Sequence, residues 1–257
     1  MKSAPKHSRY FAYLTGLALF ISLIGLVAVY NASVVEAFND FHDKYYFVKQ
    51  QAAWLLLGLF FYFTASSLPL KFYKKIALPF LVVALLSLVL AGLFLIFSSS
   101  YRLERLKTFI EPTGDPLGRS YHINQVLLGL GSGGLFGVGL GRSRQKYAYL
   151  PEATTDSIFA IVGEELGLIG SLILIGLLLS LSLLAFRIAF LAPDQHGRLL
   201  AAGVAILFSA QTFVNLASMV AMVPLTGIPL PLISYGGSAL VTTFAALGIL
   251  ASVARQI

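Results

Sequence analysis

The chain has 257 residues, of which 58% are hydrophobic and only 11% are charged, and its mean hydropathy is +0.84. Soluble globular proteins carry about 25% charged residues and disordered chains are more polar still, so this composition excludes both classes. The sequence has no cysteine, which excludes disulfides and a cysteine nucleophile, and its net charge of +7 indicates membrane topology rather than nucleic-acid binding. We therefore predict an all-α polytopic membrane helix bundle, with residues 1–257 as a single domain.

Apolar stretches of about 20 residues, the length that crosses a bilayer core, recur along the sequence. The first, from Phe11 to Tyr30, is too long for a signal peptide and no A-x-A cleavage site follows it, so we interpret it as a retained anchor. About six transmembrane helices are predicted in all, at residues 10–30, 50–69, 76–97, 158–186, 199–222 and 237–254.

Basic residues gather on alternate connections between these spans. One set of connections, which includes both termini, holds a single acid, Asp194, and nine cations: Lys2, Lys6, Arg9, Lys71, Lys74, Lys75, Arg187, Arg198 and Arg255. By the positive-inside rule this set is cytoplasmic, so both termini are expected inside the cell. Three connections are then external: a short first loop with Glu36, Asp40 and Asp43 against Lys44 and Lys49, a long, partly re-entrant segment at about 98–157, and a loop at about 223–236.

The long external segment carries further cations, among them Arg102, Arg142, Arg144 and Lys146. Two interpretations stay open: a solvated loop that meets anionic lipid headgroups, or a cationic lining for a phosphate-bearing substrate. The run from Gly129 to Gly141 contains seven glycines in thirteen positions. Because it lacks the Gly-Lys-Ser/Thr ending and the preceding strand of a P-loop, we expect backbone that packs at the membrane surface.

Two acidic residues precede the fourth span. Asp156 is expected in the first turn of this helix, where a carboxylate is favoured by the helix dipole and can cap the helix. The alternative is a general base at the external membrane surface, with Glu152 four residues earlier as its neighbour.

Two further acids, Glu164 and Glu165, fall inside the fourth span. Ionisable groups within a membrane span are candidates for function because their insertion is costly. They would either line a substrate cavity or bind the polar face of the next span, which consists of Gln211, Asn215 and Ser218.

The last connection, from Pro224 to Ser238, contains three prolines and three glycines and cannot form regular helix. Irregular backbone at membrane depth persists only when it is buried in protein or lines a wet cavity. We therefore expect this segment, with Ser234 and Tyr235, to face the 98–157 segment and close a site with it.

Several blocks, taken together and in order, resemble the signatures of the SEDS family (FtsW, RodA, SpoVE). The resemblance runs from about Ser98 to the C-terminus and is weaker over residues 10–75. Gln145-Lys146-Tyr147 is more similar to the FtsW/SpoVE branch than to RodA. The matching blocks are Ser100–Leu106, Gly133–Gly141, Leu150–Asp156, Gly163–Gly167 and Gly227–Ser238.

The resemblance implies a peptidoglycan glycosyltransferase of cell division and septal wall synthesis, which polymerises lipid II outside the bacterial cytoplasmic membrane beside a class B penicillin-binding protein and other division proteins. By resemblance, Asp156 would deprotonate the acceptor sugar's 4-hydroxyl, which attacks the donor's anomeric carbon with inversion. We expect the external cations, or a divalent metal such as Mg²⁺ or Mn²⁺, to neutralise the departing polyprenyl pyrophosphate. The predicted substrate-binding residues are Glu152, Lys146, Arg142, Arg144, Arg102, Glu164, Glu165, Gln211, Ser234 and Tyr235.

One departure from the family concerns its central spans. The chain passes from a third-span sequence, Lys74–Pro79, to a seventh-span ending, Phe97–Tyr101, so the spans between them are missing. Two other functions therefore stay open. A lipid II flippase or other transporter would need Glu164 and Glu165 rather than Asp156, and a non-catalytic division scaffold would need neither.

Overall fold

The computed structural model describes residues 7–97, 121–147, 150 and 152–257. Throughout this part the regular structure is helical, without any strand, which confirms the predicted all-α class. The helices are α1 (His7–Phe41), α2 (Tyr46–Ser67), α3 (Leu70–Phe97), α5 (Tyr121–Ser132), α6 (Ile158–Leu191), α7 (Gln195–Met219) and α8 (Gly237–Ala254).

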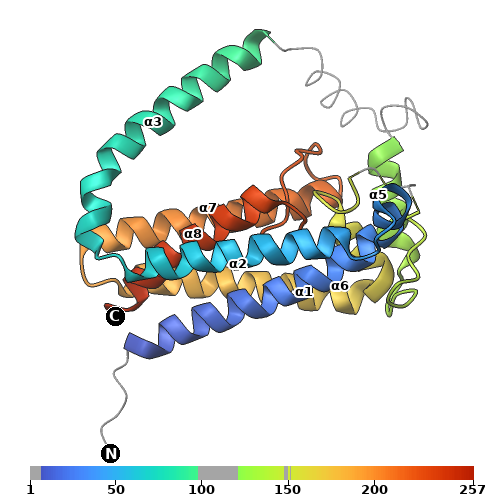
Figure 1. Ribbon diagram of the computed structural model, residues 1–257, viewed down its shortest axis with the longest axis horizontal. Helices are drawn as coiled ribbons and strands as arrows, with labels where there is room; N and C mark the ends of the chain where they lie inside the picture. The colour runs from blue at the N-terminus through green and yellow to red at the C-terminus, as the bar shows by residue number, and fades with distance from the viewer. Residues whose placement is uncertain (1–6, 98–120, 148–149, 151) are drawn as a thin grey trace, which may run out of the picture.

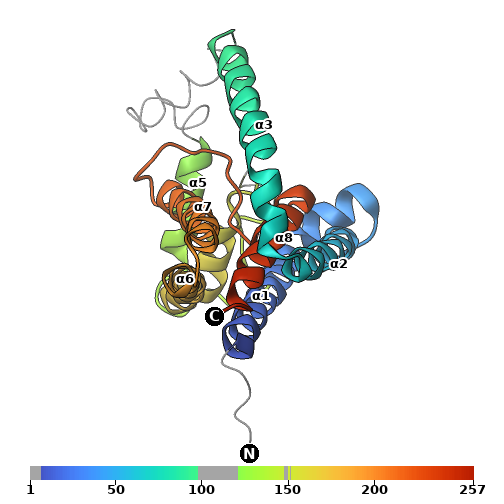
Figure 2. The same cartoon turned by 90° about the vertical axis from the view of Figure 1, so that its left-hand side faces the viewer.

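Five long helices, α1, α2, α6, α7 and α8, lie side by side in one bundle (Figures 1 and 2). The most extensive contact is between α2 and α8, followed by α6 with α7. Glycine permits the close approach of α2 and α8, since a Cβ at Gly248 would lie 2.5 Å from the carbonyl oxygen of Tyr62. Small residues at such contacts are typical of helices that associate in lipid.

The two ends of the bundle differ in what they carry (Figure 1). The beginning of α1, the α6–α7 turn and the C-terminus lie at one end. The opposite end holds α5, the glycine-rich run that follows it and the connection between α7 and α8. The described parts of the long segment and of the last loop, both predicted to be external, therefore lie at the same end of the bundle, away from the beginning of α1 and the C-terminus (Figure 1).

Fewer helices than predicted are long and apolar enough to cross a membrane. Among the described residues four qualify singly, α1, α6, α7 and α8, and a fifth span results if α2 and the first part of α3 are taken together across a bend of 111°. The prediction of about six counted α2 and α3 as two separate spans. Figure 1 instead shows α3 projecting away from the bundle, and the side chains of its residues 70–87 are largely exposed, Leu78 and Phe80 among them.

The glycine-rich run packs its main chain against a kink in α6. This close packing of backbone was expected from the sequence in preference to a phosphate-binding loop. Gly167 interrupts the helix with φ 67° and ψ −165°. The kink frees the carbonyl oxygens of Glu164 and Glu165, which accept hydrogen bonds from the main-chain N–H groups of Val138 (3.0 Å) and Gly139 (3.1 Å). A Cβ at Gly137 would lie 2.1 Å from the carbonyl oxygen of Glu165, so only glycine permits this approach.

Candidate functional site

Asp156 lies at the end of the bundle where the α5–α6 and α7–α8 connections meet. It is one residue before Ser157, the N-cap of α6, and not in the first turn of the helix as predicted. Its residue surface is only 6% exposed. A carboxylate at this position is thus largely removed from bulk water, and a low dielectric strengthens its interaction with a hydroxyl bound beside it.

A turn holds Asp156 next to Glu152. The carbonyl oxygen of Glu152 accepts from the main-chain N–H groups of Thr155 and Ser157, both at 3.2 Å. The Thr155 hydroxyl lies 2.7 Å from Glu152 Oε2 and 3.4 Å from Asp156 Oδ1. Glu152 is exposed whereas Asp156 is buried, so the Thr155 hydroxyl lies between a solvent-exposed carboxylate and a buried one.

The connection between α7 and α8 closes over this turn, as the sequence predicted. The side-chain amide of Asn215 in α7 donates to the carbonyl oxygens of Asp156 (2.8 Å) and Ile228 (2.7 Å). The N–H of Tyr235 donates to the carbonyl oxygen of Thr154 over 2.9 Å. The connection is also re-entrant, because a Cβ at Gly25, well inside α1, would lie 2.3 Å from the carbonyl oxygen of Leu232.

Three of the predicted substrate-binding residues fix this connection in place. Gln211 Nε2 donates to the carbonyl oxygen of Pro229 over 3.1 Å, and Ser234 Oγ accepts from the N–H of Leu230 over 2.8 Å. The Tyr235 hydroxyl donates to Gln50 Oε1. Burial, and to a lesser extent Tyr46 and Glu36, raise the pKa of Tyr235 above its ordinary value, so the phenol remains a hydrogen-bond donor.

Helix α2 contributes two glutamines that sequence reasoning missed. In addition to the contact of Gln50 with Tyr235, the buried Gln51 donates from Nε2 to the carbonyl oxygen of Ser234 over 3.0 Å. His122 of α5 was also missed, and its Nε2 lies 2.7 Å from Ser157 Oγ. Adjacent glutamines near the start of an apolar helix were the available signal, since buried amides need partners.

Glu164 and Glu165 hold the loop between α5 and α6 rather than the polar face of α7. Both residues are 2% exposed. Glu164 accepts from the Ser143 hydroxyl and from the main-chain N–H groups of Arg144 (3.0 Å) and Gln145 (3.3 Å). Of the two alternatives left open by the sequence, bonding to Gln211, Asn215 and Ser218 is therefore not observed, because the loop offers nearer donors and α7 uses its amides on main-chain carbonyls.

The predicted external cations fall into two groups. Lys146 is buried, and its Nζ lies 3.6 Å from Glu165 Oε1 and donates to the carbonyl oxygen of Gly141, so its charge is engaged beneath the surface. Arg142 and Arg144 are exposed on the same loop. Arg102 lies outside the described residues. In the described ranges no three Asp, Glu or His residues are placed to hold a metal ion.

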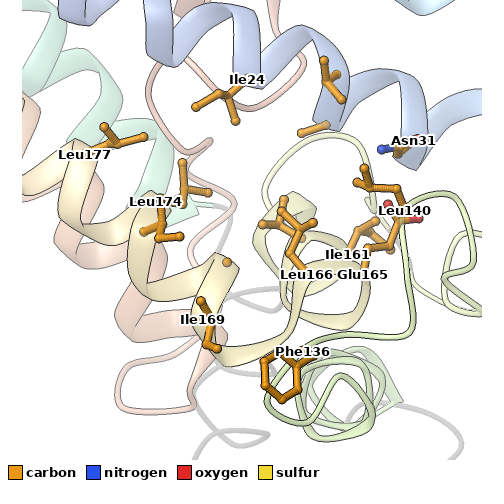
Figure 3. A pocket seen from close by; sticks show the side chains of 15 residues that line it. Ile24, Asn31, Phe136, Leu140, Ile161, Glu165, Leu166, Ile169, Leu174 and Leu177 are labelled. Atoms are coloured by element: carbon orange, nitrogen blue, oxygen red, sulfur yellow. The ribbon is translucent and has the colours of Figure 1, made fainter.

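Two cavities approach this network from α1. An apolar groove of about 440 Å³ runs between α1 and α6, with Ile24 and Leu174 along it and Asn31 and Glu165 toward one end (Figure 3). A more polar cavity of about 400 Å³ is lined by Lys146, Glu152 and Thr154 together with the α1 residues Glu36, Asn39 and Asp40. The Lys146–Glu165 ion pair thus stands between the two cavities, since Glu165 lines the first and Lys146 the second.

Glu36 and Asp40 were interpreted from sequence as charges of a short first loop. They instead lie on α1, which continues to Phe41 and brings residues four apart onto one face. The extension of α1 beyond the membrane span therefore supplies one wall of the polar cavity.

Comparison with known proteins places this arrangement in a family. The sequence profile described as cell cycle protein (FtsW/RodA/SpoVE) matches residues 11–94 and 91–257. A Trichlorobacter lovleyi protein named "Probable peptidoglycan glycosyltransferase FtsW" is 43% identical over 178 residues, covering 69% of this chain and 44% of that protein. Stage V sporulation protein E of Bacillus subtilis is 45% identical over 161 residues, covering 63% of this chain and 44% of that protein.

The fold is also that of a solved relative. The rod shape determining protein RodA of Thermus thermophilus aligns with a TM-score of 0.63 and 26% identity over 95% of this chain and 96% of that one. This chain spans less than half the length of the two curated relatives above, and its two profile matches meet at residues 91–94, within α3. Because the profile covers nearly all of it, this multi-pass membrane protein belongs to the FtsW/RodA/SpoVE family of cell cycle proteins.

Proposed function

We propose that this chain is a peptidoglycan glycosyltransferase that polymerises lipid II, with Asp156 as the general base. The observation that carries the proposal is the buried carboxylate of Asp156 in a turn that α5, α7 and the α7–α8 connection hold in place. A carboxylate fixed in this way performs proton abstraction with little reorganisation. The names of the FtsW relatives support the same activity.

The reaction needs one proton transfer and one displacement. Asp156 accepts the proton of the acceptor sugar's 4-hydroxyl, and the oxygen attacks the anomeric carbon of the donor. The bond from that carbon to the pyrophosphate oxygen breaks with inversion, and the polyprenyl pyrophosphate leaves with the electron pair. The exposed Arg142 and Arg144 are the described cations that would neutralise the leaving group, whereas Lys146 would act by holding Glu165.

The substrate has a long apolar tail and a head that carries sugars, and two neighbouring cavities suit these parts. The groove between α1 and α6 is lined almost entirely by apolar side chains, which favours a polyprenyl chain. The polar cavity at Glu152 and Lys146 begins on the other side of the Lys146–Glu165 pair. Because the acids Glu36, Asp40 and Glu152 outnumber Lys146 there, this cavity would receive the sugar hydroxyls rather than the pyrophosphate, which supports an amphiphilic substrate with its tail in the groove.

The proposed membrane topology follows from the distribution of basic residues between the two ends of the bundle. Asp156 would face the outside of the bacterial cytoplasmic membrane, and both termini would be cytoplasmic, in keeping with the basic residues at that end. The partner would be a class B penicillin-binding protein, and the place of action the division septum with other division proteins.

Two variants distinguish the polymerase from a transporter or a scaffold. Asp156→Asn should abolish glycan polymerisation from labelled lipid II by the purified chain with a class B partner, while lipid II translocation in vesicles and co-purification of the partner persist. Glu164→Gln/Glu165→Gln should reduce polymerisation through loss of loop order. Loss of translocation in the glutamine variant alone, or full activity of Asp156→Asn, would contradict the proposal.

A further inference from the structure

A third cavity lies at the other end of the bundle, between the beginning of α1 and the last turns of α6. Its volume is about 360 Å³, and its lining residues are Arg9, Tyr10, Tyr13, Leu184 and Arg187. Asp156 comes just before α6 begins at Ile158, whereas Leu184 and Arg187 are in the last turns of this helix. The length of α6 therefore lies between Asp156 and the cavity (Figure 1). The cavity is therefore separate from the proposed active site.

The charge of this cavity is positive, since its lining includes two arginines and no acid. Within the described part of the chain the ion pairs are Lys49–Asp43 and Lys146–Glu165, so neither arginine has a carboxylate partner there. Asp194, the acid of the adjacent α6–α7 turn, accepts from the N–H of Gly197 and caps α7. Two like charges beside one cavity repel each other unless an anion lies between them.

The arginines are placed for recognition of a planar or tetrahedral oxyanion. The guanidinium carbon of Arg187 lies 5.9 Å from the ring centroid of Tyr10, which joins α6 to α1 and orients the side chain. Arg9 and Arg187 are both exposed, so their N–H groups are accessible to a ligand. Guanidinium groups bind phosphate oxygens through paired hydrogen bonds, which an ammonium group does not reproduce.

Apolar surface continues from the cavity toward the middle of the bundle. On α6, Leu179, Leu183 and Arg187 are four residues apart and share one face, and the two leucines are more than half exposed. On α1, Tyr13 is also more than half exposed. Tyrosine and arginine beside exposed leucine are typical of the headgroup level of a membrane, where the rings and charges meet lipid phosphate.

We propose that this cavity binds the phosphate of an anionic membrane phospholipid, with the guanidinium groups of Arg9 and Arg187 as its donors and the acyl chains along α1 and α6. The site does not depend on Asp156 or on glycan polymerisation. A basic residue near a membrane surface contributes about fivefold in affinity for anionic lipid, so removal of both charges should weaken binding about 25-fold.

The full chain, purified in detergent and stripped of lipid, is titrated with phosphatidylglycerol, with zwitterionic phosphatidylcholine and with inorganic phosphate, and the bound lipid is counted by native mass spectrometry. Arg9→Gln/Arg187→Gln should bind phosphatidylglycerol about 25-fold more weakly than the parent. Lys74→Gln/Arg198→Gln removes two exposed charges from the same end of the bundle but outside the cavity, and should bind like the parent.

Three results would overturn the proposal. The first is equal loss in the two double variants, which would indicate diffuse surface charge. The second is equal binding of phosphatidylcholine, and the third is occupancy by inorganic phosphate alone that excludes the lipid, which would identify a soluble anion.

Should the glutamine pair not fold, Arg9→Lys/Arg187→Lys keeps the charge but not the paired donors. It should bind more weakly than the parent, and unchanged binding would contradict the phosphate contact.

Discussion

The side-chain amide of Asn215 donates to the main-chain carbonyl oxygen of Asp156 over 2.8 Å, and it donates to that of Ile228 as well. One fully buried side chain on α7 therefore joins the turn that carries the proposed base to the re-entrant connection that covers it. Non-helical backbone at this depth has carbonyls that need donors, and a membrane interior provides no water to supply them.

Replacing Asn215 by alanine should destabilise the protein and lower polymerisation together. Two carbonyl oxygens lose their donor, and each unsatisfied buried group costs about 1–3 kcal/mol. The partly buried Gln211 makes the matched control, because Gln211→Ala removes one hydrogen bond, to Pro229. Thermal unfolding in detergent should show the larger loss for Asn215→Ala, and equal losses would contradict the role of Asn215.

The close approach of the glycine-rich run to α6 predicts that alanine has very different effects on stability at two glycines. Gly137 has φ 80°, and its Cβ would collide with the carbonyl oxygen of Glu165, whereas a Cβ at Gly131 in α5 would have no atom within 4 Å. Gly137→Ala should therefore cost about 1–2 kcal/mol from backbone conformation alone, with the collision in addition. Gly131→Ala should be neutral or stabilising by up to about 1 kcal/mol, as in other helix interiors. Similar unfolding temperatures for the two variants would contradict this packing.

The Lys146–Glu165 ion pair predicts that substitutions of its two residues have strongly non-additive effects on the free energy of unfolding. Lys146→Met leaves the Glu165 carboxylate buried without its cation and should destabilise by about 3–5 kcal/mol. Adding Glu165→Leu removes the stranded charge and should recover much of that loss. A double-mutant cycle by thermal unfolding measures the coupling, and additive losses would show that the two residues act independently.

The sequence predicted where the six long apolar helices lie, but neither their extent nor how many of them are long and apolar enough to cross a membrane singly. The prediction ended the first span at residue 30, whereas α1 continues to Phe41. Apolar length reports the thickness of the bilayer, and a helix continues beyond it when its end packs on protein, as α1 does through the buried Ala37, beside the exposed Glu36 and Asp40 that line the polar cavity. The bend between α2 and α3 was not predictable, because the hydropathy of two segments does not report the angle between the helices that they form.

For the site, sequence predicted which segments meet but not which atoms join them. The prolines and glycines between α7 and α8 predicted a re-entrant connection that closes on the segment before α6, and the Tyr235–Thr154 hydrogen bond confirms it. Of the two alternatives for Glu164 and Glu165, bonding to the polar face of α7 is not observed. The side-chain partners of Glu164 and Glu165 are the Ser143 hydroxyl, the Lys146 ammonium and main-chain N–H groups of the α5–α6 loop, and those of Asn215 are main-chain carbonyls; the periodicity of side chains along a helix does not reveal such loop groups.

The role of Asp156 is tested most directly by steady-state kinetics of glycan polymerisation. The purified chain and its Asp156→Asn variant, each with a class B penicillin-binding protein, are assayed over a range of labelled lipid II concentrations. Removal of a general base should lower kcat by about 10²–10⁴-fold, and because the carboxylate acts in the transition state, KM should change little. An unchanged kcat in a well-folded Asp156→Asn variant, or no product from a parent chain that binds lipid II, would contradict the proposed chemistry.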